Sequence, residues 1–195
     1  MSKTNTERKE ELQMSLQQRL TYLKEQKRAY IQGTLEYVND EWVFLDEESE
    51  EAALLEDITD GDIEVFRFGK WINGKICEDG TVLFSTQYYT LKNGEVVRFR
   101  KHLPYAYEQW LQSLSDKTFF YYIQLLNEHD FSLYDCLYCY NGLLFGSEIG
   151  VNFIIYDNNE RIANVQHYYE RKTSNKDRFE ITFSTGKRLV CTQIG

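Results

Sequence analysis

The stretch at residues 131–146, FSLYDCLYCYNGLLFG, joins a helical middle part of the chain to a strand-rich C-terminal part. It carries two of the four cysteines, Cys136 and Cys139, and it ends in the pair Asn141-Gly142. Asn-Gly suits the positive φ angles of a two-residue hairpin turn. We therefore predict a hairpin at this pair, and beyond it an antiparallel sheet of four or five strands with helices against one side.

The residues before this stretch, 103–129, predict a helical hairpin. Pro104 fits the first turn of a helix, where no backbone N–H is needed, and Ser115 can cap a second helix. Each helix has an apolar face at helical spacing. These faces contain Tyr107, Trp110, Leu111 and Leu114 in the first helix, and Phe119, Tyr122, Ile123 and Leu126 in the second.

Residues 33–101 predict a small antiparallel β-barrel of SH3-like or OB-like type. Short β-rich runs alternate with turn pairs such as Asn39-Asp40 and Asn93-Gly94. The run at 63–71 is predicted as one strand that ends at the turn Asn73-Gly74. An insertion at 46–62 holds nine acidic residues in seventeen positions and a helical spacing of apolar residues, which predicts a short helix over the barrel.

The first 32 residues predict a helix over 7–30 that Gly33 ends. Its narrow apolar stripe either docks on the rest of the chain, or pairs with a partner helix or with a second copy, which would make a homodimer. The stripe consists of Leu12, Leu16, Leu20, Leu23 and Tyr30.

The sequence as a whole predicts an α+β protein with three parts: an N-terminal helix at 1–32, a barrel-like domain at 33–101, and a helical hairpin with a sheet at 102–195. Hydrophobic residues make up 42% of the 195 residues, and no run of about 20 apolar residues could span a membrane. The N-terminus lacks the apolar core of a secretory signal, so we expect a cytoplasmic protein with reduced cysteines.

The spacing Cys136-x-x-Cys139 is the one pattern that resembles a metal or redox motif. A zinc site would need two further ligands from distant sequence, since no second close pair exists. On a regular strand the two cysteines would point to opposite faces. Buried, chemically inert thiols are the competing interpretation, because free cysteine is often buried. The further candidate ligands are Cys77, Cys191, His102, His129 and His167.

The charge distribution predicts a protein partner more readily than a nucleic acid. The net charge is −9, and residues 33–101 alone carry 7 Lys/Arg against 16 Asp/Glu. An anionic protein repels phosphate backbones but attracts a basic partner. Nucleic-acid binding through the barrel stays an alternative that requires its basic residues to share one face. Those residues are Arg67, Lys70, Arg98, Arg100 and Lys101.

We therefore expect a non-enzymatic protein-binding or adaptor module without a cofactor, and a zinc- or thiol-dependent protein is the alternative. The phosphate-loop, dinucleotide-binding, nucleophile-elbow and HExxH fingerprints do not occur in the sequence. Tyrosine and tryptophan suit binding surfaces, and carboxylates suit a basic partner. The candidate partner-binding residues are Glu47, Glu48, Glu50, Glu51, Tyr105, Tyr107 and Trp110.

Four segments together resemble an uncharacterised family of proteins from bacilli and related bacteria, a domain of unknown function. They are LPYAY at 103–107, FSLYDCLYC at 131–139, GVNFIIYDN at 150–158 and TGKRL at 185–189. The resemblance covers residues 17–193 and leaves the first sixteen as an extension. It implies a bacterial cytoplasmic protein and assigns no catalytic residues.

Overall fold

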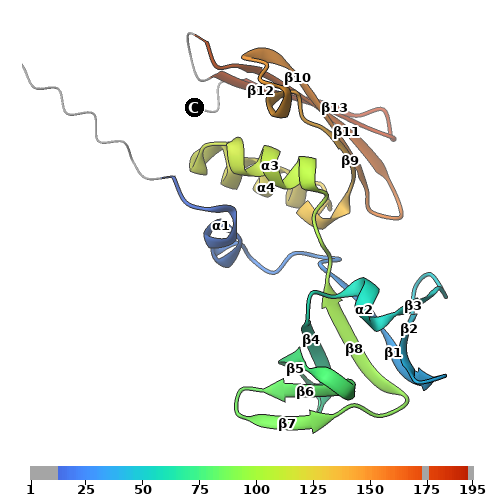
Figure 1. Cartoon of the computed structure of the whole chain (residues 1–195). Helices are drawn as coiled ribbons and strands as arrows, with labels where there is room; N and C mark the ends of the chain where they lie inside the picture. The colour runs from blue at the N-terminus through green and yellow to red at the C-terminus, as the bar shows by residue number, and fades with distance from the viewer. Residues whose placement is uncertain (1–12, 173–175, 193–195) are drawn as a thin grey trace, which may run out of the picture. The chain divides into compact units, whose positions relative to one another are not determined.

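The computed structural model describes residues 13–172 and 176–192 and shows an α+β protein with two antiparallel sheets (Figure 1). The chain divides into two compact units. The insert unit is Arg28–His102, and the helix–sheet unit combines the described residues up to Lys27 with those from Leu103 onward. Each unit has its own core and is considered by itself.

The insert unit is an eight-stranded antiparallel sheet with the order β3-β2-β1-β8-β4-β5-β6-β7. Its core gathers the inward-facing residues of several strands, among them Leu35, Phe44, Val65, Val97 and Phe99. Helix α2 (Leu55–Ile58) and the short 3₁₀ segment η1 (Glu78–Gly80) lie between strands. The strands are β1 (Tyr30–Val38), β2 (Glu41–Asp46), β3 (Ala52–Leu54), β4 (Asp62–Arg67), β5 (Lys70–Ile76), β6 (Thr81–Phe84), β7 (Gln87–Thr90) and β8 (Glu95–Arg100).

The predicted closed barrel is not confirmed, because the sheet is open between β3 and β7 in the described chain. The predicted meander is interrupted as well. The last strand, β8, lies between β1 and β4 and pairs antiparallel with both. The strand that enters the unit and the strand that leaves it are therefore neighbours, with Lys101 N donating to Ala29 O at 2.9 Å.

The predicted strand at 63–71 is wrong, because the chain turns back inside it. β4 and β5 form a hairpin with Phe68 and Gly69 at its tip, both at positive φ. The expected turn residue Gly74 lies within β5, where an added Cβ would come 2.5 Å from a methyl carbon of Val82. Gly74 is therefore explained by close packing between strands rather than by a turn.

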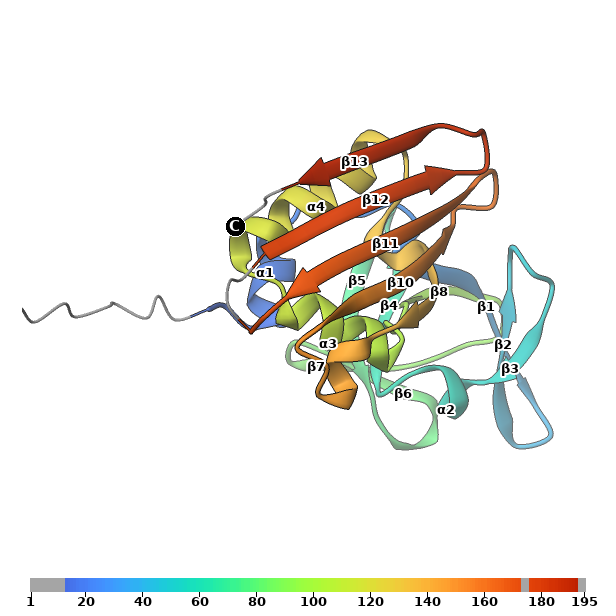
Figure 2. The same cartoon turned by 90° about the horizontal axis from the view of Figure 1, so that it is seen from above.

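The helix–sheet unit packs helices on one face of a five-stranded sheet (Figure 2). The order is β13-β12-β11-β10-β9, with every neighbouring pair antiparallel, which confirms the predicted sheet. Its helices are α1 (Leu16–Tyr22), α3 (Tyr105–Ser113) and α4 (Asp116–Glu128). Its strands are β9 (Cys136–Tyr140), β10 (Ile149–Asp157), β11 (Ile162–Glu170), β12 (Lys176–Phe183) and β13 (Arg188–Thr192).

Aromatic side chains fill the space between α3, α4 and the sheet. Tyr107 and Trp110 from α3 and Tyr122 from α4 are fully buried and contact Tyr156 and Phe179 of the sheet. The Tyr122 hydroxyl donates to that of Tyr156 (2.7 Å), which donates to that of Tyr107 (2.9 Å). The two predicted helices are thus confirmed, whereas the tight helical hairpin predicted for them is not.

The predicted two-residue turn at Asn141-Gly142 is also wrong. A 3₁₀ segment, η3 (Gly142–Phe145), follows β9, and Gly146 rather than Gly142 has a positive φ. Asn141 caps this segment by accepting from Leu143 N, and it donates to Ala106 O. The buried Asn side chain therefore fixes a longer connection than the hairpin rule suggests.

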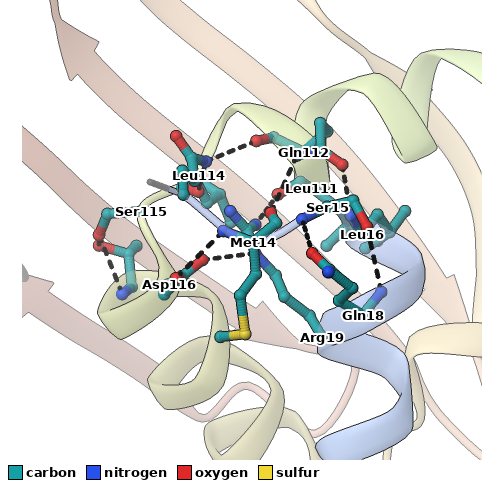
Figure 3. A network of polar contacts seen from close by, with 12 residues as sticks. Met14, Ser15, Leu16, Gln18, Arg19, Leu111, Gln112, Leu114, Ser115 and Asp116 are labelled. Atoms are coloured by element: carbon teal, nitrogen blue, oxygen red, sulfur yellow. Dashed lines mark hydrogen bonds and ion pairs between the residues drawn. The ribbon is translucent and has the colours of Figure 1, made fainter. Parts of the chain in front are cut away.

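The N-terminal helix is shorter than predicted and docks on α3 and α4 (Figure 3). Ser15 begins it with a capping box, and the chain is extended again at Leu23. Tyr30 belongs to β1, paired with Arg100, and Gly33 lies inside that strand beside Leu45 O. Residues 7–12 of the predicted helix lie outside the described residues.

Figure 3 shows the polar contacts that hold α1. Arg19 is completely buried; its Nε donates to Asp116 Oδ1 (2.7 Å) and its Nη1 to Leu111 O (2.9 Å). Leu16 N donates to Gln112 Oε1, and Gln112 Nε2 donates to Met14 O. Gln13 Nε2, just before the helix, donates to Gln112 O (2.9 Å) and to Leu114 O (2.6 Å), so carbonyl groups at the C-terminal end of α3 have partners outside that helix.

Candidate functional site

The insert unit contains an open groove of about 720 Å³. Its walls come from the β1–β2 hairpin, from α2 and the loop after it, and from the segment between β5 and β6. The edge strands β3 and β7 contribute Leu54 and Thr90 to the lining. A volume of this size lies within the range of about 300–1,000 Å³ that is typical of ligand pockets.

The β1–β2 hairpin places two aromatic rings side by side in the groove. Asn39 and Asp40 both have positive φ and form its tight turn, so Tyr37 pairs directly with Trp42 across the two strands. The ring centroids are 5.2 Å apart with the planes at 52°. Tyr37 N also donates to Asn93 Oδ1 at 2.9 Å, which holds this end of β1.

Gly80 fixes the position of the Trp42 ring. Its φ is +66°, and an added Cβ would lie 2.0 Å from Trp42 Nε1. The indole therefore lies directly against the backbone of η1, where only glycine leaves enough space. The indole of Trp42 is thus packed against the backbone on one side and against the Tyr37 ring on another part of its surface.

Four carboxylates line the same groove as these rings, and the apolar part of the lining is called its floor. Asp40 and Glu41 come from the hairpin, and Glu56 and Asp60 come from α2 and its following loop. Among the described residues that line the groove there is no lysine, arginine or histidine. The exposed His102 faces it from nearby, with its Nδ1 3.8 Å from Asp60 Oδ2. The apolar floor consists of Leu54, Leu55 and Ile76.

This arrangement suits a cation with an aliphatic stem. The face of an aromatic ring attracts a cation within about 6 Å, and carboxylates add direct charge pairing. Lysine and arginine side chains combine such a head group with an apolar stem that can cover Leu54 or Ile76. Cys77 also lines the groove, and its thiol donates to Lys75 O at 3.7 Å.

Comparison with known proteins places the chain in a family. The model of the family described as "Protein of unknown function (DUF2777)" matches residues 17–193. The chain belongs to the DUF2777 family. It is also 29% identical over 188 residues to the uncharacterised protein YisN of Bacillus subtilis (strain 168). This alignment covers 94% of each chain. No solved structure matches it.

The predicted family resemblance is thereby confirmed, with the same residue range. In this DUF2777 chain, none of the described helices is both long enough and apolar enough to cross a membrane.

The predicted acidic contact residues lie next to the groove in sequence but do not line it. They are on the connection between β2 and β3, where the side chain of Asp46 accepts from the backbone N–H groups of Glu48 and Ser49. All four are exposed. The four are Glu47, Glu48, Glu50 and Glu51.

The predicted aromatic contact residues belong to the helix–sheet unit of this DUF2777 chain and differ in accessibility. Tyr105 is 70% exposed, whereas Tyr107 and Trp110 are fully buried. Of these three, only Tyr105 presents its ring to a partner in this conformation. Sequence reasoning missed Tyr37 and Trp42, although the predicted turn at Asn39-Asp40 already places them opposite each other in a hairpin.

Cys136 and Cys139 face the same side of β9, not opposite sides as predicted. A β-bulge shifts the register, so that Cys139 pairs with Ile154 and Cys136 with Tyr156, two buried residues on the same face of β10. Burial raises the pKa of both thiols, that of Cys139 to about 12. Within residues 13–172 and 176–192, no three His, Cys, Asp or Glu side chains form a group that could hold a metal ion.

His167 is buried and fully hydrogen-bonded. Its Nδ1 accepts from Trp110 Nε1 (2.8 Å), and its Nε2 lies 2.8 Å from Asp177 Oδ1, which also pairs with Arg171. Because Nδ1 accepts the indole N–H, the proton is on Nε2 and the ring is neutral. Its one lone pair is occupied, so this histidine holds the core together instead of acting as a base.

The five basic residues considered for nucleic-acid binding do not share one face. Glu64 pairs with Arg98 across β4 and β8, whereas Arg67 points to the opposite side of β4. Arg98 is also enclosed by the rings of Tyr30 (4.0 Å) and Trp71 (4.4 Å) and paired with Glu64 at 2.5 Å. This guanidinium is therefore already neutralised and stacked within the unit.

Proposed function

We propose that this chain is a non-enzymatic protein-binding module whose groove in the insert unit takes a basic segment of a partner protein. The observation that carries the proposal is the Tyr37–Trp42 ring pair beside four carboxylates. The partner's lysine or arginine head group lies against the rings and carboxylates, and its stem covers the apolar floor.

Electrostatics and preorganisation both support a basic partner. Residues 28–102 carry the 7 Lys/Arg and 16 Asp/Glu of 33–101 plus Arg28, a net charge of −8. A field of this sign speeds the encounter with a basic segment and slows that with an acidic one. Because Trp42 packs against the backbone at Gly80, its ring loses less side-chain entropy than a fully solvated ring would when the ligand enters.

A labelled hexa-arginine peptide tests the groove directly by fluorescence anisotropy. The double variant Glu41→Gln/Glu56→Gln removes two groove carboxylates, and Glu47→Gln/Glu48→Gln removes two charges from the β2–β3 connection as a matched control. We expect the groove variant to weaken binding about tenfold, equivalent to about 1.4 kcal/mol, and the control to change it far less. Trp42→Ala should weaken binding as well.

Equal losses for both double variants would show that only the overall charge matters, and the proposed groove would be rejected. A larger loss for Glu47→Gln/Glu48→Gln would place the binding surface on the β2–β3 connection. Added salt should weaken the wild-type complex, because exposed charges are screened. A hexa-glutamate peptide should not bind.

A further inference from the structure

The tip of the β4–β5 hairpin, residues 66–71 with the sequence FRFGKW, presents a phenylalanine at its turn. Phe68 is 88% exposed, more than any other large hydrophobic side chain of the described chain. Its φ is 53°, and Gly69 follows at 75°. Two positive φ angles in succession are typical of a type I′ turn, which favours asparagine, aspartate or glycine.

Phe68 is unfavourable for the insert unit in two ways. A bulky residue at positive φ strains the backbone, and an exposed phenyl ring gains nothing from burial. Outliers of this kind tend to occur at binding sites, where contacts in a complex compensate for the strain. Within the unit the Phe68 ring has a cation contact, with Arg67 Cζ 5.4 Å from its centroid, but glycine would make the same turn with less strain.

The chemistry of the tip is the complement of that of the groove. The tip contains two cations and no acidic residue. Lys70 is exposed, while Arg67 lies 3.9 Å from the Tyr89 ring centroid and 3.9 Å from Glu95. Phe66, 45% exposed, and Trp71 have ring centroids 5.0 Å apart with their planes tilted by 59°. The groove, in turn, offers carboxylates, two rings and an apolar floor.

We propose that the segment bound in the groove is the β4–β5 tip of a second copy of this chain. Phe68 packs on the floor beside Tyr37 and Trp42, and Lys70 faces the carboxylates of Glu41 and Glu56. The inference rests on the proposed function and names its partner. Because two different surfaces meet, each bound copy leaves one tip and one groove free, so association continues into open chains or closes into rings.

Sedimentation velocity of the full chain tests this inference with two variants. Phe68→Gly removes the ring and relieves the backbone strain, so it folds at least as well as the wild type. Glu41→Gln/Glu56→Gln weakens the groove. We expect the wild type to form dimers and larger species as its concentration rises to about 1 mM, a range in which weak contacts become populated. Each variant alone should stay monomeric.

Mixing the two variants gives the decisive result. The Phe68→Gly chain keeps its groove and the Glu41→Gln/Glu56→Gln chain keeps its tip, so together they should form one-to-one dimers and nothing larger. Lys70→Glu should also abolish self-association, whereas Lys75→Glu, an equal charge change on β5 outside the tip, should not. Self-association that persists in both single variants would overturn the inference.

The outcomes separate this inference from the proposed function. A wild type that is monomeric at every concentration but binds hexa-arginine in the groove would leave the proposed function standing with a foreign partner, and the second copy would be excluded. A wild type that neither self-associates nor binds the peptide would reject both.

Discussion

At the scale of single residues, the interior of the helix–sheet unit contains buried polar side chains whose hydrogen-bonding groups each have a specific partner. His167 stacks on Phe179 with a centroid distance of 4.6 Å, accepts a hydrogen bond from Trp110 Nε1 and donates one from its Nε2 to Asp177 Oδ1. Asn152 contributes from β10, with its Nδ2 3.2 Å from the same ring nitrogen and its Oδ1 accepting from Gly142 N. The one lone pair and the one N–H of the neutral His167 ring therefore both take part in hydrogen bonds.

This geometry predicts that acid weakens the fold through His167. Burial lowers its pKa, although the hydrogen bond to Asp177 acts in the opposite direction and Arg171 adds to the lowering. In the unfolded chain the pKa of His167 has the ordinary histidine value of about 6.5. Around and below that pH the unfolded chain therefore binds the proton more readily than the folded chain. The stability that neutral His167 provides is present above about pH 6.5 and is lost as the pH falls toward the folded pKa.

Urea unfolding at pH 7.5 and pH 5.5 measures this effect. The wild type should be less stable at pH 5.5, and His167→Gln should show a smaller difference between the two pH values. Burial also lowers the pKa of His129, and Lys187 and Arg161 add to the lowering, so His129→Gln should reduce the difference as well and measures the separate share of that residue. An unchanged pH difference in His167→Gln would contradict the assignment.

At the scale of elements, α1 is held by tertiary contacts rather than by its own length. Seven residues are too few for an isolated helix to be stable in water. The buried Arg19 spans the end of α3 and the start of α4, and its guanidinium also lies 5.2 Å from the Phe119 ring centroid. The helix is thus fixed by Arg19, a charged residue that the spacing of apolar residues in the sequence does not mark as buried.

Arg19→Ala should therefore destabilise the helix–sheet unit. Breaking a buried ion pair costs about 3 kcal/mol at the low end, and the low end applies because Asp116 keeps contact with water. Gln17→Ala on the exposed side of the same helix is the control, and it should change the free energy of unfolding by less than about 0.5 kcal/mol. Equal effects of the two substitutions in urea titrations would show that Arg19 has no special role.

The elements also show which parts of the fold could be predicted from the sequence. Alternation and helical spacing predicted the five-stranded sheet, both helices before it and the β1–β2 turn correctly, because these patterns reflect burial. Glycine was misread where it serves close packing: Gly33 and Gly74 lie inside strands, against Leu45 O and Val82. The turn at Phe68-Gly69 was missed because no rule places phenylalanine at positive φ.

The candidate site was partly within reach of the sequence. The acidic insertion and its short helix were recognised, but the groove needs the β1–β2 hairpin beside α2, a contact between segments that no local pattern encodes. The same holds for the two cysteines, whose shared face depends on a bulge in β9. A bulge is a property of strand pairing and has no signature in a single strand.

At the scale of the whole molecule, one unit is inserted into the other. The helix–sheet unit needs residues from both sides of the insert unit, whereas the insert unit is one continuous segment. Its first and last strands are hydrogen-bonded neighbours, with Tyr30 opposite Arg100. The two points where the chain enters and leaves it are therefore close together.

Residues 28–102 should accordingly fold as an independent domain. They contain all eight strands of their sheet and the residues of its core, so cutting before Arg28 and after His102 breaks no strand pairing. Circular dichroism should show a cooperative thermal transition, and the domain should bind hexa-arginine as the full chain does. A fragment that ends at residue 94 and so lacks β8 is the control, and it should not fold. A non-cooperative transition for 28–102 would contradict the prediction.

The distance in sequence between Arg19 and Asp116 has a consequence for folding during synthesis. Asp116 is 97 positions later in the chain, so α1 leaves the ribosome long before the helices that bury it exist. The eight-stranded sheet is completed in the interval. The Arg19 side chain, completely buried in the folded unit, must therefore spend that time in water, which an arginine tolerates better than an apolar residue in its place would.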